Sequence, residues 1–408
     1  MTWLSTMISA RTWGLKTAFA AALTTGVMST SAMAQAPPGV NGMIQAFQTW
    51  AATNSLTNAS LFIARDGTEI GRATIGAWTV DTPAPIASTS KAITAVCLGT
   101  LIDSRQVALT DTIQFLLPVF TRSLSAVGQA NSGRITVEQL LRHASGLEGN
   151  ANLTPPREPT QVSYATGAAQ AHPDEWFATQ ALNTPLFAVP GTTYAYANVN
   201  YAILGLIIRT VSGQAYETYC KNAVLTPRGA SNAHIAAGNS AMEAFGGWTI
   251  SAREYSSFYW HSFNRSALSD WATAFMDRVY DTSCTTCSYG LGVGVTAVGY
   301  GYSQVVYPMP EAVSVILTTT PHGKVMSPIV AGQDPLMLPI LHPDIPPYDL
   351  AHTGDWTGAT TPSQFSSIAM FWSNGVTAFV VCDRGFASAP NQQPALMNAL
   401  STSALTIN

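Results

Sequence analysis

Charged residues are scarce in this chain. Asp, Glu, Lys and Arg make up only 10% of its 408 residues, against roughly a quarter in an average globular protein. It has no basic patch or lysine run that would bind the phosphates of a nucleic acid. Hydrophobic residues make up 47% of the chain, enough to bury a large core. The composition therefore predicts a globular protein with a neutral polar surface, and it argues against nucleic acid as a partner.

Metal-binding patterns are also missing. The chain has seven histidines, but they form no HExxH motif and no pair at ligand spacing. Separately, the absence of the GxSxG sequence, in which an α/β-hydrolase carries its nucleophile, argues against that kind of enzyme. The histidines, in turn, give no sign of a metal site. We therefore expect a reaction that needs no metal and no cofactor.

Cysteines are few, and their number is odd. With five in the chain, at least one must lack a partner within it. Cys284 and Cys287 lie in a polar segment and are predicted to form a small disulfide, since a metal site would need further ligands. Cys97, Cys220 and Cys382 lie in apolar segments, where a free cysteine commonly serves as a buried packing residue. These three are predicted to be unpaired.

The apolar run near the N-terminus is too short to span a bilayer. Residues 1–34 instead have the features of a signal peptide: positive charge at Arg11 and Lys16, an apolar stretch at 18–28, and the small-x-small sequence Ala32-Met33-Ala34. We predict cleavage after Ala34 and a secreted or periplasmic protein with no stable membrane anchor.

Hydrophobic periodicity predicts strands near both ends of the chain and helices between them. Strands are expected over 60–64, 69–75, 290–298, 314–319, 366–372 and 376–382. Helices are expected over 41–52, 88–102, 137–142, 174–181, 201–211, 214–224 and 393–400. This order predicts a sheet-bearing domain made of residues 35–86 and 283–408, with a mostly helical domain of residues 87–282 inserted into it.

Residues 295–351 are rich in proline. Nine prolines between Gly294 and His352 preclude a long helix and predict an ordered, irregular insertion. This insertion either walls the substrate cleft or forms a surface or a dimer contact.

The tetrad Ser88-Thr89-Ser90-Lys91 is the strongest chemical signal. Lys91 is the only charged residue between Asp81 and Asp103. In a helix, residues three apart share a face, so the Lys91 amine can contact the Ser88 hydroxyl. An apolar surrounding favours the neutral amine, which can then accept the serine proton. The alternative is a chance match, with the lysine reaching to water.

Two further elements follow in order. Tyr196-Ala197-Asn198 precedes an apolar run, and His352-Thr353-Gly354 precedes a strand-like segment. Together with the tetrad, they resemble the motifs of the serine beta-lactamase and penicillin-binding-protein superfamily. The likeness is to the branch of class C beta-lactamases, D-specific peptidases and family VIII carboxylesterases. It covers roughly residues 40–385 and includes similar segments at 134–147, 246–251 and 289–292.

The resemblance implies an α+β fold of the beta-lactamase/transpeptidase type, an antiparallel sheet flanked by helices with an inserted, mostly helical domain. It implies that Ser88 is the nucleophile and Lys91 its proton acceptor. Tyr196 would serve as acid and base. Asn198 would hold Lys91 and the substrate carbonyl by hydrogen bonds.

The resemblance also implies the rest of the site. The backbone N–H groups of Ser88 and Asp355 are expected to form an oxyanion hole. Substrate binding is expected at four residues: His352, Thr353, Gly354 and Trp356. Independently of the resemblance, four aromatic residues near these motifs either line an apolar cleft or pack in the core: Trp356, Trp248, Tyr194 and Tyr289. His143 is expected to organise a turn and not to take part in the chemistry.

His352 departs from the classical pattern. Beta-lactamases of this branch have lysine there, a fixed cation for the beta-lactam carboxylate, and neutral histidine is a weaker anchor. We therefore expect a serine hydrolase that acts on small or polymer-derived carboxylic esters. The alternatives are a D-alanyl-D-alanine carboxypeptidase, a D-aminopeptidase-type peptidase or a weak beta-lactamase, and thirdly a sensor that is acylated without turnover. The oligomeric state stays open.

Overall fold

A computed structural model gives the structure of the chain. It describes residues 38–147, 172–237, 240–264, 266–279, 289–297, 314–320, 323–329, 348–356, 365–385 and 392–407. All of these residues fall within one compact unit. The expected signal peptide lies outside the described residues, and the division into two domains stays a prediction.

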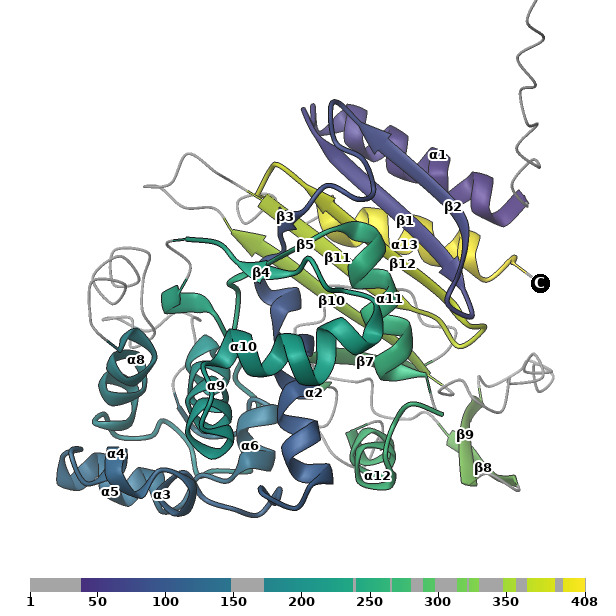
Figure 1. Cartoon of the computed structure of the whole chain (residues 1–408). Helices are drawn as coiled ribbons and strands as arrows, with labels where there is room; N and C mark the ends of the chain where they lie inside the picture. The colour runs from purple at the N-terminus through teal and green to yellow at the C-terminus, as the bar shows by residue number, and fades with distance from the viewer. Residues whose placement is uncertain are drawn as a thin grey trace, which may run out of the picture. The chain divides into compact units, whose positions relative to one another are not determined.

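An antiparallel sheet of seven strands forms the centre of the compact unit (Figure 1). Its order is β2 (Thr68–Ile75), β1 (Ala59–Arg65), β12 (Val376–Cys382), β11 (Phe365–Phe371), β10 (Tyr348–Trp356), β7 (Val293–Ala297) and β6 (Tyr289–Gly290). Strand β1 therefore pairs with β12 from the other end of the chain. The predicted α+β fold with an antiparallel sheet is confirmed.

Both faces of the sheet are covered by helices. Helices α1 (Pro38–Thr53) and α13 (Gln392–Ala404) pack together on one face (Figure 1). Helices α11 (Ala252–Phe263) and α2 (Ser90–Asp103) belong to the core on the other face. All seven residues of β12 are buried, which explains why this strand is an almost uninterrupted apolar run.

Strand β12 shows how the two cores divide. Val376, Ala378 and Val380 belong to the core with α1 and α13, whereas Phe379 and Val381 belong to the core with α11. This is the alternation that a pleated strand imposes on its side chains. The sheet is therefore a layer between two hydrophobic cores.

The segment between β2 and β6 is mostly helical. After α2 it contains α3 (Ile113–Leu116), α4 (Pro118–Thr121), α5 (Ala126–Ser132), α6 (Val137–Leu141), α8 (Pro173–Leu182), α9 (Asn198–Ser212), α10 (Tyr216–Cys220), α11 and α12 (Asp270–Val279). A small sheet joins β3 (Ala84–Pro85), β5 (Trp248–Ile250) and β4 (His234–Ile235). The helices predicted over 137–142, 174–181 and 201–211 are confirmed.

Side-chain caps define where several of these helices begin. Thr136 accepts a hydrogen bond from the backbone of Gln139, and the Gln139 side chain accepts one from Thr136, so α6 starts with a capping box. Ser251 caps α11 by accepting from the backbone of Glu254. These bonds satisfy backbone donors that have no partner inside the helix.

Three boundaries differ from the sequence prediction. The helix expected over 88–102 begins at Ser90, and residues Ala87–Thr89 form a 3₁₀ turn before it. The helix expected over 214–224 is the short α10, followed by a π-helical turn at Lys221–Leu225. The strand expected over 290–298 is a hairpin of β6 and β7, in which Leu291 and Gly292 both have positive φ.

The proline-rich segment contains regular structure. Strands β8 (Ser314–Thr320) and β9 (Gly323–Ile329) pair antiparallel, and the strand predicted at 314–319 is confirmed. The expectation of an irregular insertion is wrong for these residues, because Pro328 is compatible with an edge strand of a two-stranded sheet. Residues 330–347 lie outside the described part of the chain.

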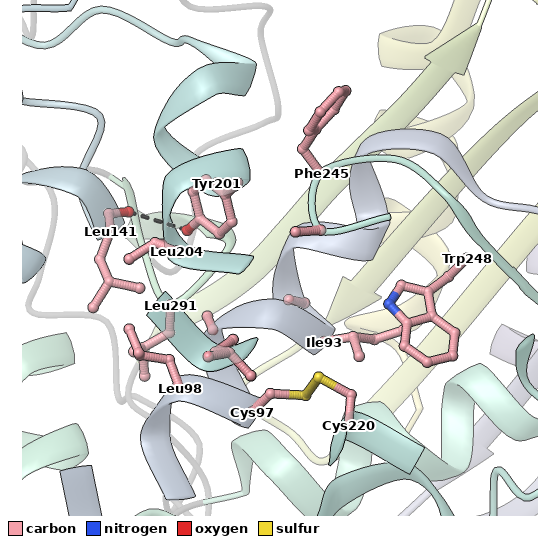
Figure 2. Close-up of a cluster of buried hydrophobic side chains, with 14 of the residues drawn as sticks. Ile93, Cys97, Leu98, Leu141, Tyr201, Leu204, Cys220, Phe245, Trp248 and Leu291 are labelled. Atoms are coloured by element: carbon pink, nitrogen blue, oxygen red, sulfur yellow. Dashed lines mark hydrogen bonds between the residues drawn. A yellow bond between two sulfur atoms is a disulfide. The ribbon is translucent and has the colours of Figure 1, made fainter. Parts of the chain in front are cut away.

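Cys97 of α2 and Cys220 of α10 form a disulfide (Figure 2). The prediction that both are unpaired is wrong. An apolar flank suits a buried free cysteine and a buried disulfide equally, and the contact between α2 and α10 is not visible in the sequence. Cys382 is free and buried, as predicted. The expected pair Cys284 and Cys287 lies outside the described residues.

No helix within the described ranges has both the length and the apolar character needed to cross a bilayer.

Candidate active site

Ser88 lies in the 3₁₀ turn that precedes α2, and its side chain is half-buried. The preceding residue, Ala87, has a φ of +47°, a left-handed conformation that is strained for alanine. Hydrogen bonds hold the turn in place. The carbonyl oxygen of Ile86 accepts a hydrogen bond from the hydroxyl of Ser367 on β11 at 2.6 Å. The N–H of Ile86 donates to the carbonyl oxygen of Trp248 at 3.1 Å.

Lys91 is fully buried, with 0% of its surface exposed. Its Nζ lies 3.0 Å from Oγ of Ser88, 2.7 Å from Oδ1 of Asn198 and 2.9 Å from the carbonyl oxygen of Phe245. The contact with Ser88 confirms the predicted proximity of the two side chains. The position of the Phe245 carbonyl was not predicted, because this residue is 154 positions away from Lys91.

Tyr196 lies in the extended segment just before α9, and Asn198 is the first residue of that helix. The Nζ of Lys91 is 4.8 Å from the centre of the Tyr196 ring. The ring of His143 lies on Tyr196 as well, with a centroid distance of 4.4 Å. The structure thus brings together four of the predicted residues from two distant stretches of the chain: Ser88, Lys91, Tyr196 and Asn198.

Strand β10 places its last residues against the nucleophile turn. Its described ladder with β7 ends at Ala351, whereas the ladder with β11 continues to Trp356. A Cβ on Gly354 would clash with the carbonyl of Ile86 and would lie 3.0 Å from the backbone N of Ser88. The absence of a side chain at Gly354 is therefore what lets β10 approach Ser88 this closely.

Asp355 follows Gly354 on β10. Its Oδ1 accepts a hydrogen bond from the hydroxyl of Ser366 at 2.6 Å, and Ser366 is its partner in the ladder with β11. This bond ties the Asp355 carboxylate to the sheet. The side chain of Thr353 is half-buried, and that of Trp356 lies outside the described part of the structure.

His352 is buried and pairs with Tyr289 of β6. Its Nε2 is 2.8 Å from the Tyr289 hydroxyl. Burial, reinforced by the charge of Lys91, lowers the pKa of His352 to about 3. Burial raises the pKa of Tyr289 well above its ordinary value, so the phenol keeps its proton. With its lowered pKa, His352 is a neutral imidazole.

Of the other aromatic residues predicted for a cleft or the core, Trp248 belongs to the core. It is fully buried, and its indole N–H donates to the Tyr216 hydroxyl at 3.0 Å. Figure 2 shows it near Ile93, within the same cluster of buried side chains as Phe245. Tyr194 is half-buried, with its ring 6.3 Å from that of Tyr289.

Two glycines outside the predicted site lie against its backbone. Gly292, with a φ of +77°, lies against the backbone of Lys91, where a Cβ would clash with the Lys91 carbonyl. Gly246 lies against Ala87. Only the similarity of segments 246–251 and 289–292 to known motifs pointed to them. No group of three or more potential metal ligands occurs in the part of the chain that the structure describes.

The model of the Beta-lactamase family matches residues 41–333. Protein flp of Staphylococcus aureus is 30% identical over 142 residues, which cover 35% of this chain and 26% of flp. Penicillin-binding protein 4 of Amycolatopsis lactamdurans is 28% identical over 160 residues, which cover 39% of this chain and 37% of that protein. The matched region thus spans about a quarter to two fifths of these relatives.

Solved structures show the same fold. A D-stereospecific amidohydrolase from Streptomyces sp. has a TM-score of 0.58 at 17% identity, with 86% of this chain and 96% of that one covered. EstCE1, described as a hydrolase with promiscuous acyltransferase activity, has 0.57 at 14%, covering 88% and 99%. A mutant class C beta-lactamase has 0.59 at 12%, covering 91% and 99%. The predicted beta-lactamase/transpeptidase-like fold is confirmed.

Proposed function

The chain belongs to the Beta-lactamase family, and within this family of serine hydrolases we propose that it is a secreted enzyme that cleaves carboxylic esters through an acyl-serine intermediate. The observation that carries the proposal is the 3.0 Å contact between Nζ of Lys91 and Oγ of Ser88. A serine hydroxyl becomes a nucleophile when a neighbouring group takes its proton.

The other contacts of Lys91 support this role. Oδ1 of Asn198 and the carbonyl of Phe245 have no hydrogen to give, so they can only accept from Nζ. A neutral amine has two hydrogens and one lone pair. When the two hydrogens go to these oxygens, the lone pair is left for the Ser88 hydroxyl.

The reaction then proceeds in two halves. Ser88 Oγ attacks the ester carbonyl while its proton passes to Lys91, and the backbone N–H groups of Ser88 and Asp355 receive the developing oxyanion. Tyr196 delivers a proton to the leaving alcohol. The same groups then activate a water molecule, which attacks the acyl-serine, releases the acid and restores Ser88.

His352 favours a neutral substrate. Its imidazole is uncharged in the working pH range because its pKa is about 3, so this position offers no fixed cation for a carboxylate. Substrate binding at His352, Thr353, Gly354 and Trp356 is part of this proposal, and so is low activity on beta-lactams, whose carboxylate needs such a cation.

Secretion is proposed from the signal-like residues 1–34. The disulfide Cys97–Cys220 supports it, because disulfides form and persist in oxidising compartments. Expression with the native N-terminus and N-terminal sequencing of the exported protein test this part, and the mature chain is expected to begin at Gln35. Retention of residues 1–34 on an active cytoplasmic protein would contradict it.

A second candidate is a D-specific peptidase, such as a D-alanyl-D-alanine carboxypeptidase. The similarity in fold to the D-stereospecific amidohydrolase favours it. An acylated sensor without turnover is the third candidate. It is disfavoured by the position of Asn198 and Tyr196 beside Lys91, where deacylation would use them.

A substrate panel separates these functions. Purified wild type and Ser88→Ala are assayed with p-nitrophenyl esters, nitrocefin and D-alanyl peptides. We expect ester turnover to exceed that of the other two classes and to fall by about four orders of magnitude in Ser88→Ala. Peptide turnover above ester turnover would select the peptidase, and a stable stoichiometric acyl adduct in mass spectrometry would select the sensor. Equal ester hydrolysis by both proteins would exclude Ser88 as the nucleophile.

A further inference from the structure

His143 contacts the segment that carries Tyr196 on both sides of this residue. The N–H of Ala195 donates to the carbonyl oxygen of His143 at 2.8 Å. The N–H of Ala197 donates to Nδ1 of His143 at 3.2 Å. Tyr196 is therefore flanked by two hydrogen bonds to one residue, whose ring also lies 4.4 Å from its own.

The contacts at Nδ1 fix the tautomer of His143. A backbone N–H can only donate, so Nδ1 accepts and carries no hydrogen. Nδ2 of Asn200 lies 3.0 Å from the same nitrogen. The Ser145 hydroxyl donates to Oδ1 of Asn200 at 2.7 Å, which orients the amide so that Nδ2 is the second donor. The neutral ring therefore has its hydrogen on Nε2.

The surroundings keep this ring uncharged. Only 1% of His143 is exposed. Burial is the main cause that lowers its pKa well below the ordinary value. The titratable groups that face it come from five segments: Lys91, Tyr194, Tyr196, Tyr201, Tyr289 and His352. A neutral His143 adds no positive charge beside Lys91.

The backbone of His143 is held in an unusual conformation. Its φ is +53°, in the left-handed region that costs energy for residues other than glycine and is best tolerated by asparagine and aspartate. In this conformation both the carbonyl oxygen and Nδ1 of one residue accept from the Tyr196 segment. From the sequence, His143 was predicted only to organise a turn, without a role in catalysis.

We propose that His143 is the positioning residue of Tyr196: as a neutral acceptor, it fixes the segment 195–200 so that the Tyr196 phenol stays within proton-transfer reach of Lys91 and the substrate. This inference rests on the proposed function, in which Tyr196 and Lys91 handle the proton. His143 itself exchanges no proton with the substrate.

Two substitutions separate the acceptor from the bulk of the ring. In His143→Asn, Oδ1 takes the place of Nδ1 and the residue tolerates the positive φ. His143→Leu has no acceptor at that place. We expect His143→Asn to keep ester kcat within about tenfold of wild type, and His143→Leu to lose about 10²-fold in kcat with little change in KM, since small misplacements of a catalytic group cost this much.

His143→Asp gives a readout that a purely structural role would not move. Its carboxylate accepts the same two hydrogen bonds but adds a negative charge near Lys91, which stabilises the ammonium form. The acid limb of the kcat profile should move to higher pH by about one unit, while His143→Asn should leave it in place. Thermal unfolding of each variant controls for stability.

The inference is overturned if folded His143→Leu keeps the wild-type kcat, if His143→Asn loses as much as His143→Leu, or if the acid limb of His143→Asp does not move. Should His143→Leu fail to fold, ¹⁵N NMR of the wild-type imidazole decides. A protonated Nδ1 between about pH 6 and 8 would contradict the inference. Ser88→Ala and Tyr196→Phe in the same assay separate the two proposals. An active Ser88→Ala would contradict the proposed function itself, whereas a fully active Tyr196→Phe would contradict only the role of the phenol that His143 positions.

Discussion

Gly354 and Ser88 lie so close that a Cβ on Gly354 would be 3.0 Å from the backbone N of Ser88. The nucleophile turn and the last residues of β10 therefore share one small space. In this space the proposed oxyanion hole has its two N–H donors, from Ser88 and from Asp355. The close approach of β10 to Ser88 depends on the absence of a side chain at Gly354, so a single methyl group at this position should disturb it.

Gly354→Ala should reduce ester kcat by about 10²-fold, comparable with the loss of one oxyanion donor. The added Cβ clashes with the Ile86 carbonyl and comes within 2.6 Å of the Ser367 hydroxyl, so β10 or the turn has to shift. Gly246→Ala is the matched control, because its Cβ would meet Ala87 only at 3.8 Å. Steady-state kinetics of both variants test this, and equal rates would contradict the role of Gly354.

Lys91→Met should slow acylation strongly while nearly keeping the volume of the side chain. The thioether cannot accept the Ser88 proton, and general base catalysis contributes about 10²- to 10⁴-fold. Lys91→Arg should not restore activity, since guanidinium stays charged. Single-turnover acylation by a p-nitrophenyl ester measures the step, and the thermal midpoint of each variant monitors folding. Rapid acylation of Lys91→Met would remove Lys91 from the mechanism.

Removal of the disulfide should destabilise the fold with little effect on the reaction. The bond closes a loop with a sequence separation of 123 residues, for which the loss is about 3–5 kcal/mol. The double variant Cys97→Ser/Cys220→Ser should unfold at lower denaturant and keep its ester kcat at 25 °C. Cys382→Ser serves as control, because this cysteine is free. Unchanged unfolding of wild type in reductant would contradict the prediction.

Asp349 should make stability decrease as the pH rises. Burial raises its pKa from 3.8 to about 7, so the folded state holds the proton more tightly than the unfolded state. Its contribution is complete below about pH 4 and is lost as the pH rises through about 7, with an upper limit of about 4 kcal/mol. Asp349→Asn should therefore match wild type near pH 4 and exceed it near pH 8 in urea unfolding. A parallel decline in both proteins would assign the loss to other groups.

Local features of the site and fold could be predicted from the sequence. Ser88 and Lys91 are one helical turn apart, so their contact follows from local geometry. Strand β12 was predicted with its observed bounds, 376–382. Both of its faces are buried, so its sequence is a short, nearly continuous apolar run, which is typical of a central strand. The predicted helix 41–52 lies within α1 (Pro38–Thr53) because its apolar residues repeat with the period of a helix.

Features set by distant contacts could not be predicted. Ala87 adopts a positive φ, and Ser88 lies ahead of α2, because Trp248 and Ser367 hold the turn. The hydrogen bond of His352 with Tyr289 joins residues 63 positions apart. The disulfide of Cys97 with Cys220 likewise depends on how α2 packs on α10. None of these partners has a local sequence signal.

The pairing of β1 with β12 has a consequence for the newly made chain. Ala59 lies opposite Cys382, so one edge of β1 has no partner until the residues of β12 have left the ribosome. Ser367, which holds the nucleophile turn, is also made late. Translation products that stop before residue 365 should therefore lack hydrolytic activity and expose a strand edge that promotes aggregation.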